Sequence, residues 1–299
     1  MKIKMIVMCL VLLAMALPAI DMLKPMALPN SDETILTESI YHNGLNRTYI
    51  VVLPQGFNAG TTYDMIFVLH GHGGDAEGMR SYINFFVTME ERNSFILVYV
   101  NGFDKGWNVI HCCGNAHMQN VDDVGLFRLL IGTMRQTYNI RNIFSTGHSN
   151  GGMMSHRLAA ECSDMISAIA DVSGCVGGQN DNGVDICWPS IPQNNVSVMM
   201  IHGMKDNTIF YNEPYKHGFY SIPFLDGVNW WASANNLTSK SENTTSDYRV
   251  ISWDDGKTEV VGYSYINVGH EWADPFKTVP MIFKWLSEHG KDKTEPITE

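Results

Sequence analysis

The chain has few basic residues for its length. Its 299 residues contain 20 Lys and Arg against 31 Asp and Glu, which gives a formal net charge of −11 at pH 7 with neutral histidines. Binding to a phosphate backbone needs clustered Lys and Arg, and the sequence contains no such cluster. We therefore expect no nucleic-acid partner, and the same deficit disfavours an anionic membrane surface.

Long apolar runs are also missing, apart from a short one at the N-terminus. Residues 5–17 are apolar, follow Lys2 and Lys4, and end in small residues at 14–16. About 13 apolar residues are too few for a membrane span, which needs roughly 20, and this arrangement is typical of a secretory signal peptide. We predict a signal peptide over residues 1–19 and a secreted, extracellular protein without stable membrane insertion after cleavage.

Cysteine is scarce, and its spacing does not indicate a metal site. None of the six cysteines lies in a C-x-x-C pattern, and no H-x-x-x-H pattern accompanies them, so we expect no bound metal. Removing the signal peptide would leave five cysteines, which cannot all pair. We expect a bridge between Cys175 and Cys187 across a polar loop. A second bridge from Cys162 to Cys112 or Cys113, or a vicinal bridge between that adjacent pair, stays open.

Four asparagines begin N-x-[ST] sequons without an intervening proline, namely Asn46, Asn195, Asn236 and Asn243. In a eukaryotic secretory pathway, several of them would carry glycans. In a bacterium the same triplets would carry no such meaning, and the sequence does not distinguish the two cases.

Short apolar runs alternate with segments of helical periodicity. Runs typical of buried parallel strands occur at residues 65–69, 95–100, 143–146, 166–172 and 198–202, and 47–53 alternates like an edge strand. Helical segments are predicted at 79–92, 124–138, 152–162 and 226–236, followed by a strand at 260–266 and a helix at 274–289. This alternation predicts an α/β fold with a single doubly wound, mostly parallel sheet and helices on both faces.

The domain organisation follows from the same pattern. No internal repeat and no Pro/Gly/Ser-rich linker interrupts it, so we predict one domain over residues 41–290. A linker is expected at 20–40 and a flexible tail at 291–299. The polar stretch at 235–247 is expected to be a surface excursion. We expect the mature protein to be a monomer.

A G-x-S-x-G pattern lies between a predicted strand and a predicted helix, in Gly147-His148-Ser149-Asn150-Gly151. In this context the pattern indicates a nucleophile elbow, a sharp turn that lifts the serine hydroxyl clear of the sheet. Glycines flank the serine because a Cβ would collide with the neighbouring backbone. We predict that Ser149 is a catalytic nucleophile.

A serine hydroxyl becomes nucleophilic only when a base accepts its proton and a third group orients that base. Asp206 comes just after the predicted strand at 198–202, and His270 lies between the last predicted strand and the terminal helix. Alone, Asp206 beside Asn207 could form an Asx turn or a helix cap, and His270 could be a core residue. The order Ser149, Asp206, His270, with each residue at a strand end, predicts a catalytic triad.

Acyl transfer also needs hydrogen-bond donors for an oxyanion. One donor is normally the backbone N–H after the nucleophile, here that of Asn150. The other comes from a loop after an early strand, and the glycine-rich loop at 69–74 offers the N–H of His72. We predict these two amides as the oxyanion hole. The imidazoles of that loop are expected to pack or to hydrogen-bond within it.

Two tryptophans and two aspartates remain to be placed. Trp107 and Trp272 lie in predicted loops, so we predict that they bind substrate as an aromatic wall, with core packing as the alternative. Asp122 and Asp123 precede the predicted helix at 124–138, and we expect them to cap it.

Seven segments together resemble one known family. They are Leu-His-Gly-His-Gly-Gly at 69–74, Gly-Trp-Asn at 106–108, Cys-Cys-Gly at 112–114, Val-Asp-Asp-Val-Gly at 121–125, Gly-His-Ser-Asn-Gly-Gly-Met-Met at 147–154, Ile-His-Gly-Met-Lys-Asp at 201–206 and Gly-His-Glu-Trp at 269–272. Over roughly residues 53–285 the chain resembles secreted polyhydroxybutyrate depolymerase-like and feruloyl esterase-like carbohydrate esterases of the α/β-hydrolase fold. One departure is His72, where members of the family often carry a cysteine.

The resemblance implies an extracellular ester hydrolase that needs no cofactor and whose triad is Ser149, Asp206 and His270. The implied substrates are small esters, polysaccharides or polyesters, such as feruloyl or acetyl esters of plant-wall polysaccharide and hydroxyalkanoate oligomers. No polymer-binding module is evident, which favours soluble or accessible esters. Two alternatives stay open, an acyltransferase with the same triad and a secreted binding protein without turnover.

Overall fold

A computed structural model describes residues 33–87, 93–109, 111–179, 186–212, 215–216 and 219–291. These residues all fall in one unit of the chain, Asp32–Glu299. The predicted signal peptide at 1–19 and the predicted tail from residue 292 onward lie outside the described residues. Within the described part of the chain, no helix is both long enough and apolar enough to cross a membrane.

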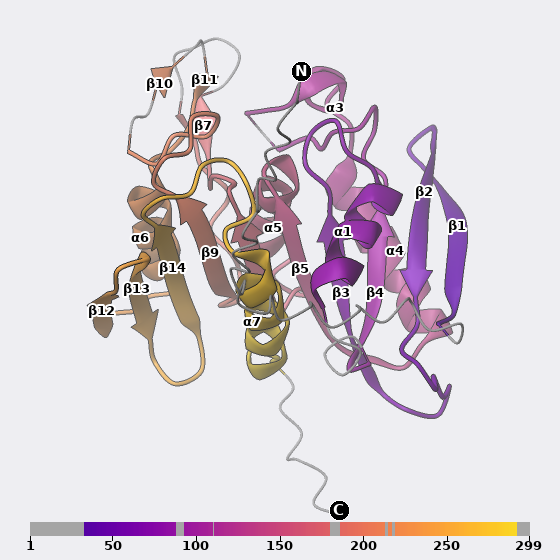
Figure 1. The fold of residues 1–299 in the computed structure, drawn as a ribbon. Coiled ribbons are helices and arrows are strands. Elements are labelled where there is room, and N and C mark those ends of the chain that lie inside the picture. Colours follow the sequence, from indigo (N-terminus) through magenta and orange to yellow (C-terminus); the bar gives the residue numbers. More distant parts are fainter. Residues whose placement is uncertain are drawn as a thin grey trace, which may run out of the picture. The chain divides into compact units, whose positions relative to one another are not determined.

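A mixed sheet of ten strands is the centre of the fold (Figure 1). Its middle strands are parallel and follow the order β4 (Phe95–Val100), β3 (Tyr63–Leu69), β5 (Ile140–His148), β6 (Ala168–Val172), β9 (Ser197–Gly203) and β14 (Glu259–Tyr265). Antiparallel strands extend both edges, namely β2 (Leu45–Val52) and β1 (Ile35–His42) beside β4, and β13 (Tyr248–Asp254) and β12 (Lys240–Thr244) beside β14. The parallel strands therefore end at one common edge, where loops can bring distant residues together.

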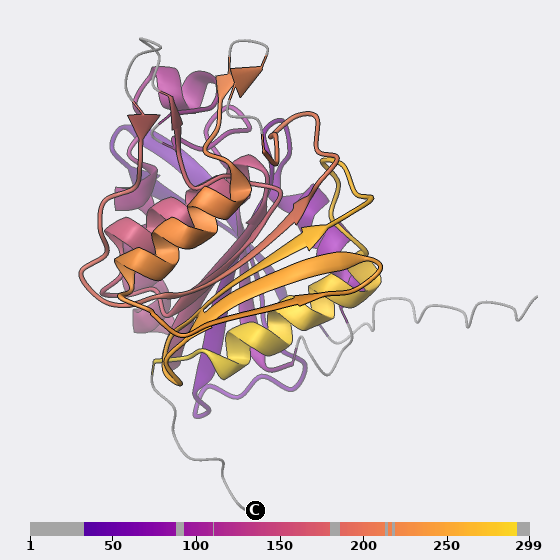
Figure 2. The same ribbon diagram turned by 90° about the vertical axis from the view of Figure 1, so that its left-hand side faces the viewer.

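Helices cover both faces of this sheet (Figure 1 and Figure 2). One face packs against α1 (Ala76–Phe86) and α7 (Pro275–Glu288). The other face packs against α4 (Asp123–Thr137), α5 (Asn150–Glu161) and α6 (Phe224–Ala234). This arrangement confirms the predicted doubly wound, mostly parallel sheet with helices on both faces.

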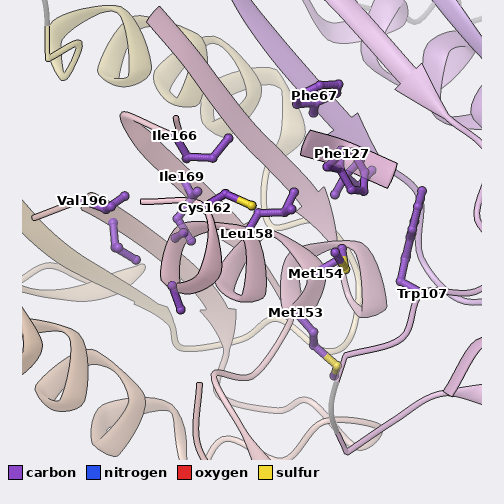
Figure 3. Packing of buried hydrophobic residues seen from close by; sticks show 14 of the residues in the cluster. Phe67, Trp107, Phe127, Met153, Met154, Leu158, Cys162, Ile166, Ile169 and Val196 are labelled. Atoms are coloured by element: carbon purple, nitrogen blue, oxygen red, sulfur yellow. The ribbon is translucent and has the colours of Figure 1, made fainter. Parts of the chain in front are cut away.

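Alternation along the strands builds the two cores. In β3, Met65, Phe67 and Leu69 belong to the core on the α4 to α6 side, whereas Ile66 and Val68 belong to the core under α1 and α7. A strand covered on both faces is apolar at most positions, which is why residues 65–69 show as a continuous run in the sequence. Figure 3 shows part of the first core, where the rings of Phe67 and Phe127 lie close to Trp107.

Shorter elements lie above the carboxyl ends of the parallel strands in Figure 1. They are α3 (Gly114–Met118), the antiparallel pair β7 (Gly178–Gln179) and β8 (Ile186–Cys187), and the antiparallel pair β10 (Tyr215–Lys216) and β11 (Phe219–Tyr220). None of them was predicted from the sequence, because elements of two to five residues are too short to show a periodicity.

At the margins of the sheet, one prediction is corrected and another is extended. The linker predicted at 20–40 is wrong from residue 35 onward, because β1 occupies 35–42 and pairs with β2 along its whole length. A two-residue Asn43-Gly44 turn joins them, with φ of 46° and 82°, a combination that favours a tight hairpin. The polar stretch at 235–247 lies largely on the surface, as predicted, but it also contains β12, whose five residues are all exposed and so carry no apolar pattern.

Candidate active site

The turn between β5 and α5 has the geometry of a nucleophile elbow. Ser149 has a φ of 53° and a ψ of −122°, a backbone conformation that residues other than glycine rarely adopt. A Cβ at Gly147 would collide with the backbone of Gly151, and a Cβ at Gly151 would collide with the carbonyl oxygen of Leu69. The glycines of the motif therefore let the chain turn so tightly that the serine side chain stands at the end of the strand.

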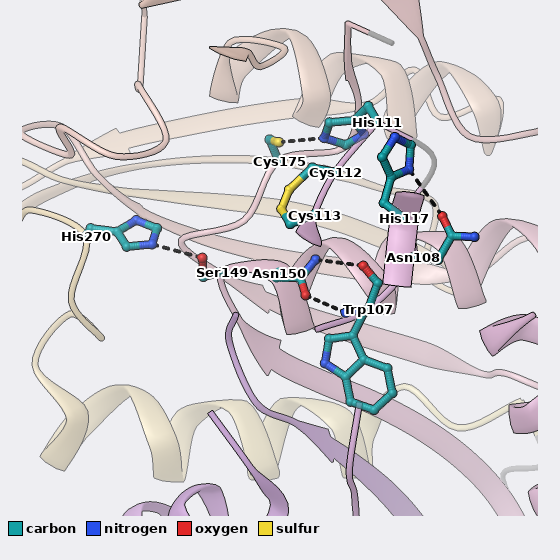
Figure 4. Close-up of a disulfide and its surroundings, with 10 residues drawn as sticks. All are labelled: Trp107, Asn108, His111, Cys112, Cys113, His117, Ser149, Asn150, Cys175 and His270. Carbon is teal, nitrogen blue, oxygen red and sulfur yellow. Dashed lines mark hydrogen bonds between the residues drawn. A yellow bond between two sulfur atoms is a disulfide. The ribbon is translucent and has the colours of Figure 1, made fainter. Parts of the chain in front are cut away.

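Three side chains that are far apart in the sequence meet at this turn. Ser149 Oγ lies 2.9 Å from His270 Nε2, and His270 Nδ1 lies 2.7 Å from Asp206 Oδ2 (Figure 4 shows the first contact). Nδ1 faces a carboxylate and so carries the proton, which leaves Nε2 free to accept a hydrogen bond from the serine hydroxyl. Asp206 follows β9 and His270 follows β14, so both come from carboxyl ends of parallel strands.

The Asp206 carboxylate is buried and fully supplied with hydrogen bonds. Its Oδ1 accepts hydrogen bonds from the amides of Thr208 at 2.8 Å and Ile209 at 2.9 Å. Burial disfavours the charged form, but the hydrogen bonds from His202 and His270 outweigh it and lower the pKa of Asp206 well below its usual range. Asp206 is therefore an anion near neutral pH, as the orienting group of a triad must be.

The glycine-rich loop after β3 lies against the elbow. Its His70 donates from Nδ1 to Gly71 O at 2.8 Å and accepts at Nε2 from the Gly102 amide at 2.9 Å. Burial lowers the pKa of His70, which is consistent with a neutral ring making these two bonds. The His72 ring fills the space beside Gly106 and Gly114, where no larger residue would fit. Packing and hydrogen bonding of both imidazoles within this region were expected.

Neither predicted oxyanion donor has a hydrogen-bond partner among the described residues, since no bond is made by the backbone N–H of His72 or of Asn150. Their assignment as the oxyanion hole stays a prediction. The side chain of Asn150 has a separate task that the sequence did not suggest. Its Oδ1 accepts from the Trp107 amide at 2.8 Å, and its Nδ2 donates to Trp107 O at 3.2 Å (Figure 4).

Trp107 does not face a substrate. Its side chain is completely buried, its indole N–H donates to His70 O at 2.9 Å, and its ring packs against Phe127. The prediction that Trp107 is part of a substrate-facing wall is therefore wrong, and the alternative of core packing holds. A position in a loop does not reveal burial, because this loop is covered by α4 and the elbow.

Trp272 lies in the wall of a cavity beside the elbow. The cavity has a volume of about 350 Å³ and is lined by residues that include His70, Met79, Tyr82, His148 and Trp272. The centroid of the Trp272 ring lies 6.3 Å from that of His148, in a stacked arrangement, and 5.6 Å from that of Tyr82. This position agrees with a substrate contact, and that role of Trp272 stays a prediction.

The cysteine pairing differs from the favoured expectation. Cys112 and Cys113 form a vicinal disulfide (Figure 4), while Cys162, Cys175 and Cys187 are free. The predicted bridge between Cys175 and Cys187 and the bridge considered for Cys162 are therefore wrong, and the vicinal alternative holds. Cys175 lies deep in the core, where burial raises the pKa of its thiol. In the described ranges, no three His, Cys, Asp or Glu side chains form a group that could hold a metal ion.

The two adjacent aspartates at the start of α4 make different contacts. Asp122 accepts at Oδ1 from the Gly125 amide at 2.9 Å, which confirms the expected cap. Asp123 does not cap the helix. It is fully buried and pairs with Arg47 at 2.8 Å, while its second oxygen accepts from the Asn108 amide at 2.8 Å. Asp123 thus fixes the loop that carries the backbone partner of Asn150.

Two further histidines border the triad and were missed by the sequence analysis. His148 Nε2 lies 3.0 Å from His270 O, so it holds the backbone of the loop that carries the predicted base. His202 Nε2 lies 3.2 Å from Asp206 Oδ2. His148 is the last residue of β5, directly before Ser149, and His202 is the penultimate residue of β9, four residues before Asp206. That position, a polar side chain at the end of an apolar run, is the signal that could have identified them.

Comparisons with known proteins show which proteins this chain resembles. No family model matches the chain. Feruloyl esterase D of Neurospora crassa is 30% identical over 192 residues, which cover 57% of this chain and 63% of that protein. The match spans less than two thirds of the length of these curated relatives, namely 63% of feruloyl esterase D and 57% of a probable feruloyl esterase C of Aspergillus oryzae.

Solved structures show the same fold. An acetyl xylan esterase from Aspergillus awamori superposes with a TM-score of 0.60 at 15% identity, covering 85% of this chain and 99% of that chain. A CE1 ferulic acid esterase from Anaeromyces mucronatus, in complex with ferulic acid, superposes with a TM-score of 0.57 at 14% identity, covering 84% and 90%. The α/β-hydrolase fold and the feruloyl esterase-like resemblance are thereby confirmed, whereas the resemblance to polyhydroxybutyrate depolymerases stays a prediction.

Proposed function

We propose that this protein is a serine carboxylic-ester hydrolase that works through Ser149, His270 and Asp206. The observation that carries the proposal is the continuous chain from Ser149 Oγ to His270 at 2.9 Å and from His270 to the buried Asp206 at 2.7 Å. The similarity to a feruloyl esterase supports the same reaction class.

The first half-reaction forms an acyl-enzyme. His270 Nε2 accepts the proton of Ser149 as its oxygen attacks the ester carbonyl carbon, and the carbonyl oxygen becomes an oxyanion. The backbone amides of Asn150 and His72 donate to that oxyanion. Protonated His270 is stabilised by Asp206 and then gives its proton to the leaving alcohol, so the ester C–O bond breaks and the acyl group stays on Ser149.

The second half-reaction releases the acid. Water takes the place of the alcohol, gives a proton to His270 and attacks the acyl carbon, and the proton returns to Ser149 as the acid departs. The same oxyanion donors serve both steps, which is why a single site suffices. Apart from the ester substrate, the proposed cycle uses only water and residues of this chain.

The proposed substrates are feruloyl or acetyl esters of plant-wall polysaccharide, or hydroxyalkanoate oligomers. A largely apolar cavity of about 350 Å³ next to the elbow, with Trp272 and Tyr82 in its wall, supports an acyl group with apolar bulk. The signal-peptide pattern at the N-terminus supports secretion as the setting of this activity.

A release assay on purified protein and its Ser149→Ala form tests the proposal. The panel contains methyl ferulate, acetylated xylan, p-nitrophenyl acetate and butyrate, and 3-hydroxybutyrate oligomers. We expect serine-dependent release of ferulate or acetate from the plant-wall substrates, and release from the oligomers alone would assign a depolymerase instead. Silence of the folded protein on every ester, or equal release by Ser149→Ala, would refute ester hydrolysis by this triad.

A further inference from the structure

A second histidine, besides His270, faces the carboxylate of Asp206. His202 is the penultimate residue of β9 and is almost completely buried. Its Nε2 lies 3.2 Å from Asp206 Oδ2, the oxygen that His270 also uses, and 2.8 Å from the carbonyl oxygen of Ile209. One imidazole nitrogen therefore reaches both the carboxylate and the turn that follows it.

The surroundings of His202 determine that its Nε2 carries a hydrogen. Nε2 faces two oxygen acceptors, Asp206 Oδ2 and Ile209 O, so it must carry a hydrogen. Nδ1 is buried, and among the described residues it has no hydrogen-bond partner. His202 is thus a hydrogen-bond donor through Nε2.

The contact with Ile209 extends the effect of His202. The Ile209 amide donates to Asp206 Oδ1 at 2.9 Å, beside the Thr208 amide at 2.8 Å. By holding Ile209 O, His202 closes the turn that presents both amides. The same N–H therefore lies 3.2 Å from one carboxylate oxygen and supports the two amide donors to the other oxygen through the backbone.

We infer that His202 is a positioning residue for the predicted catalytic acid: its Nε2–H holds the Ile209 turn around the Asp206 carboxylate and, 3.2 Å from the oxygen shared with His270, draws charge from that oxygen. The kinetic part of this inference rests on the proposed function, whereas the hydrogen-bond part does not. It assigns a task to a histidine that lies outside the Ser149, His270 and Asp206 chain.

Few other ionisable groups face this pair. The ring of His202 packs against Tyr211 at 6.2 Å and Phe224 at 5.4 Å, and the Tyr211 hydroxyl is bonded to Ser264 Oγ at 2.8 Å. Among the described residues, the groups that interact electrostatically with Asp206 include His202, His270, His148 and Cys175. Burial lowers the pKa of His148 and raises that of Cys175, which keeps both neutral near pH 7.

Removing the His202 N–H should strengthen the hydrogen bond between Asp206 and His270. A carboxylate that loses a hydrogen bond is a stronger acceptor and stabilises the protonated imidazole of His270 more. In His202→Phe, we expect the acid limb of kcat/KM against pH to move upward by about half a pH unit, so that kcat/KM falls about threefold on that limb. His202→Gln keeps a side-chain N–H and should keep the limb near its original position. His202→Leu replaces the Phe variant if the larger ring prevents folding.

Tyr211→Phe is the matched control, because it removes a buried hydroxyl from the same cluster without touching Asp206. It should leave the acid limb in place. An acid limb that stays in place in both apolar His202 variants, or that moves to lower pH in them, would overturn the inference.

A spectroscopic measurement separates this inference from the proposed function. The low-field proton resonance of His270 Nδ1–H is identified by its loss in Asp206→Asn, and it needs no substrate. We expect this resonance to move further downfield in His202→Phe and to stay in place in Tyr211→Phe. A resonance unchanged in His202→Phe refutes the inference even in an active esterase, whereas a shifted resonance in a protein without esterase activity supports it and refutes only the proposed function.

Discussion

Asn150 is the residue that couples the nucleophile turn to the loop after β4. Its side chain is 1% exposed and bonds both the amide and the carbonyl of Trp107, while its own backbone N–H is one of the two predicted oxyanion donors. The direction of that N–H therefore depends on a clamp between two loops. A donor displaced by a fraction of an ångström loses much of its stabilisation of the transition state.

Replacing Asn150 should thus lower kcat by more than the accompanying loss of stability can explain. We expect Asn150→Ala to lower kcat about tenfold to a hundredfold with little change in KM. Asn150→Asp should be worse, because it sets a carboxylate oxygen against the Trp107 carbonyl in a buried place. Steady-state kinetics with thermal melts of each variant measure both effects.

Asn235 provides the matched control for that clamp. It is also 1% exposed and makes the same pair of bonds, accepting from the Val196 amide at 3.0 Å and donating to Val196 O at 2.9 Å, but it lies at the end of α6. Asn235→Ala should lower stability about as much as Asn150→Ala and leave kcat unchanged. Equal kcat in the two variants would show that the Asn150 clamp does not affect catalysis.

At this scale, the sequence predicts which side chains meet at the elbow better than it predicts burial. Ser149, Asp206 and His270 could be identified because each follows a recognisable strand and the order is distinctive. Trp107 was misplaced because nothing in its neighbours shows that α4 and the elbow cover it. The clamp of Asn150 and the contact of His202 depend on distances between segments that no local pattern encodes.

At the scale of elements, the start of α4 joins the outer strands to the active-site loops. Asp122 caps the helix from a partly exposed position, whereas Asp123 is buried and paired with Arg47 of β2. Burial raises the pKa of Asp123, although the charge of Arg47 opposes this. A buried pair of this kind is costly to break, since the remaining charge has no partner.

The two neighbouring aspartates should therefore differ in their contributions to stability. Asp123→Ala is expected to lower the free energy of unfolding by about 3 to 5 kcal/mol, because it strands the Arg47 guanidinium in the core. Asp122→Ala removes a cap and is expected to cost only about 1 kcal/mol. Urea unfolding of both variants measures the contrast. Equal losses would mean that the Arg47 pair contributes no more than an ordinary cap.

Elements were predictable where burial imposes a period. The strands at the centre are apolar on both faces, and α7 has one apolar face, so each is visible in the sequence. β1 and β12 were missed because they are exposed edge strands. The Asn43-Gly44 turn was the overlooked signal for the β1/β2 hairpin.

At the scale of the whole molecule, several buried histidines make stability depend on pH. Burial lowers the pKa of His111 to about 4 and also lowers the pKa values of His70 and His148. In the unfolded chain these rings take up protons near pH 6.5. Between that pH and the lower folded value, the unfolded state binds more protons, so the free energy of unfolding decreases as the pH falls.

We expect the free energy of unfolding to drop by about 2 kcal/mol from His111 alone between pH 6.5 and pH 5, with further losses from His70 and His148. Urea unfolding at pH 7, 6 and 5 measures this slope. The His111→Gln variant, in which position 111 no longer titrates, should show a shallower slope than the unmodified protein. A stability that is constant or rises on acidification would contradict the account.

The most direct test of the central claim is to trap the acyl-enzyme. The protein is mixed with p-nitrophenyl acetate, quenched in acid within milliseconds to seconds, digested and analysed by mass spectrometry. We predict one acetyl group on the peptide containing Ser149, and none in Ser149→Ala. An acetyl group on another residue, or equal labelling of both proteins, would contradict a mechanism in which Ser149, activated by His270 and Asp206, is the nucleophile.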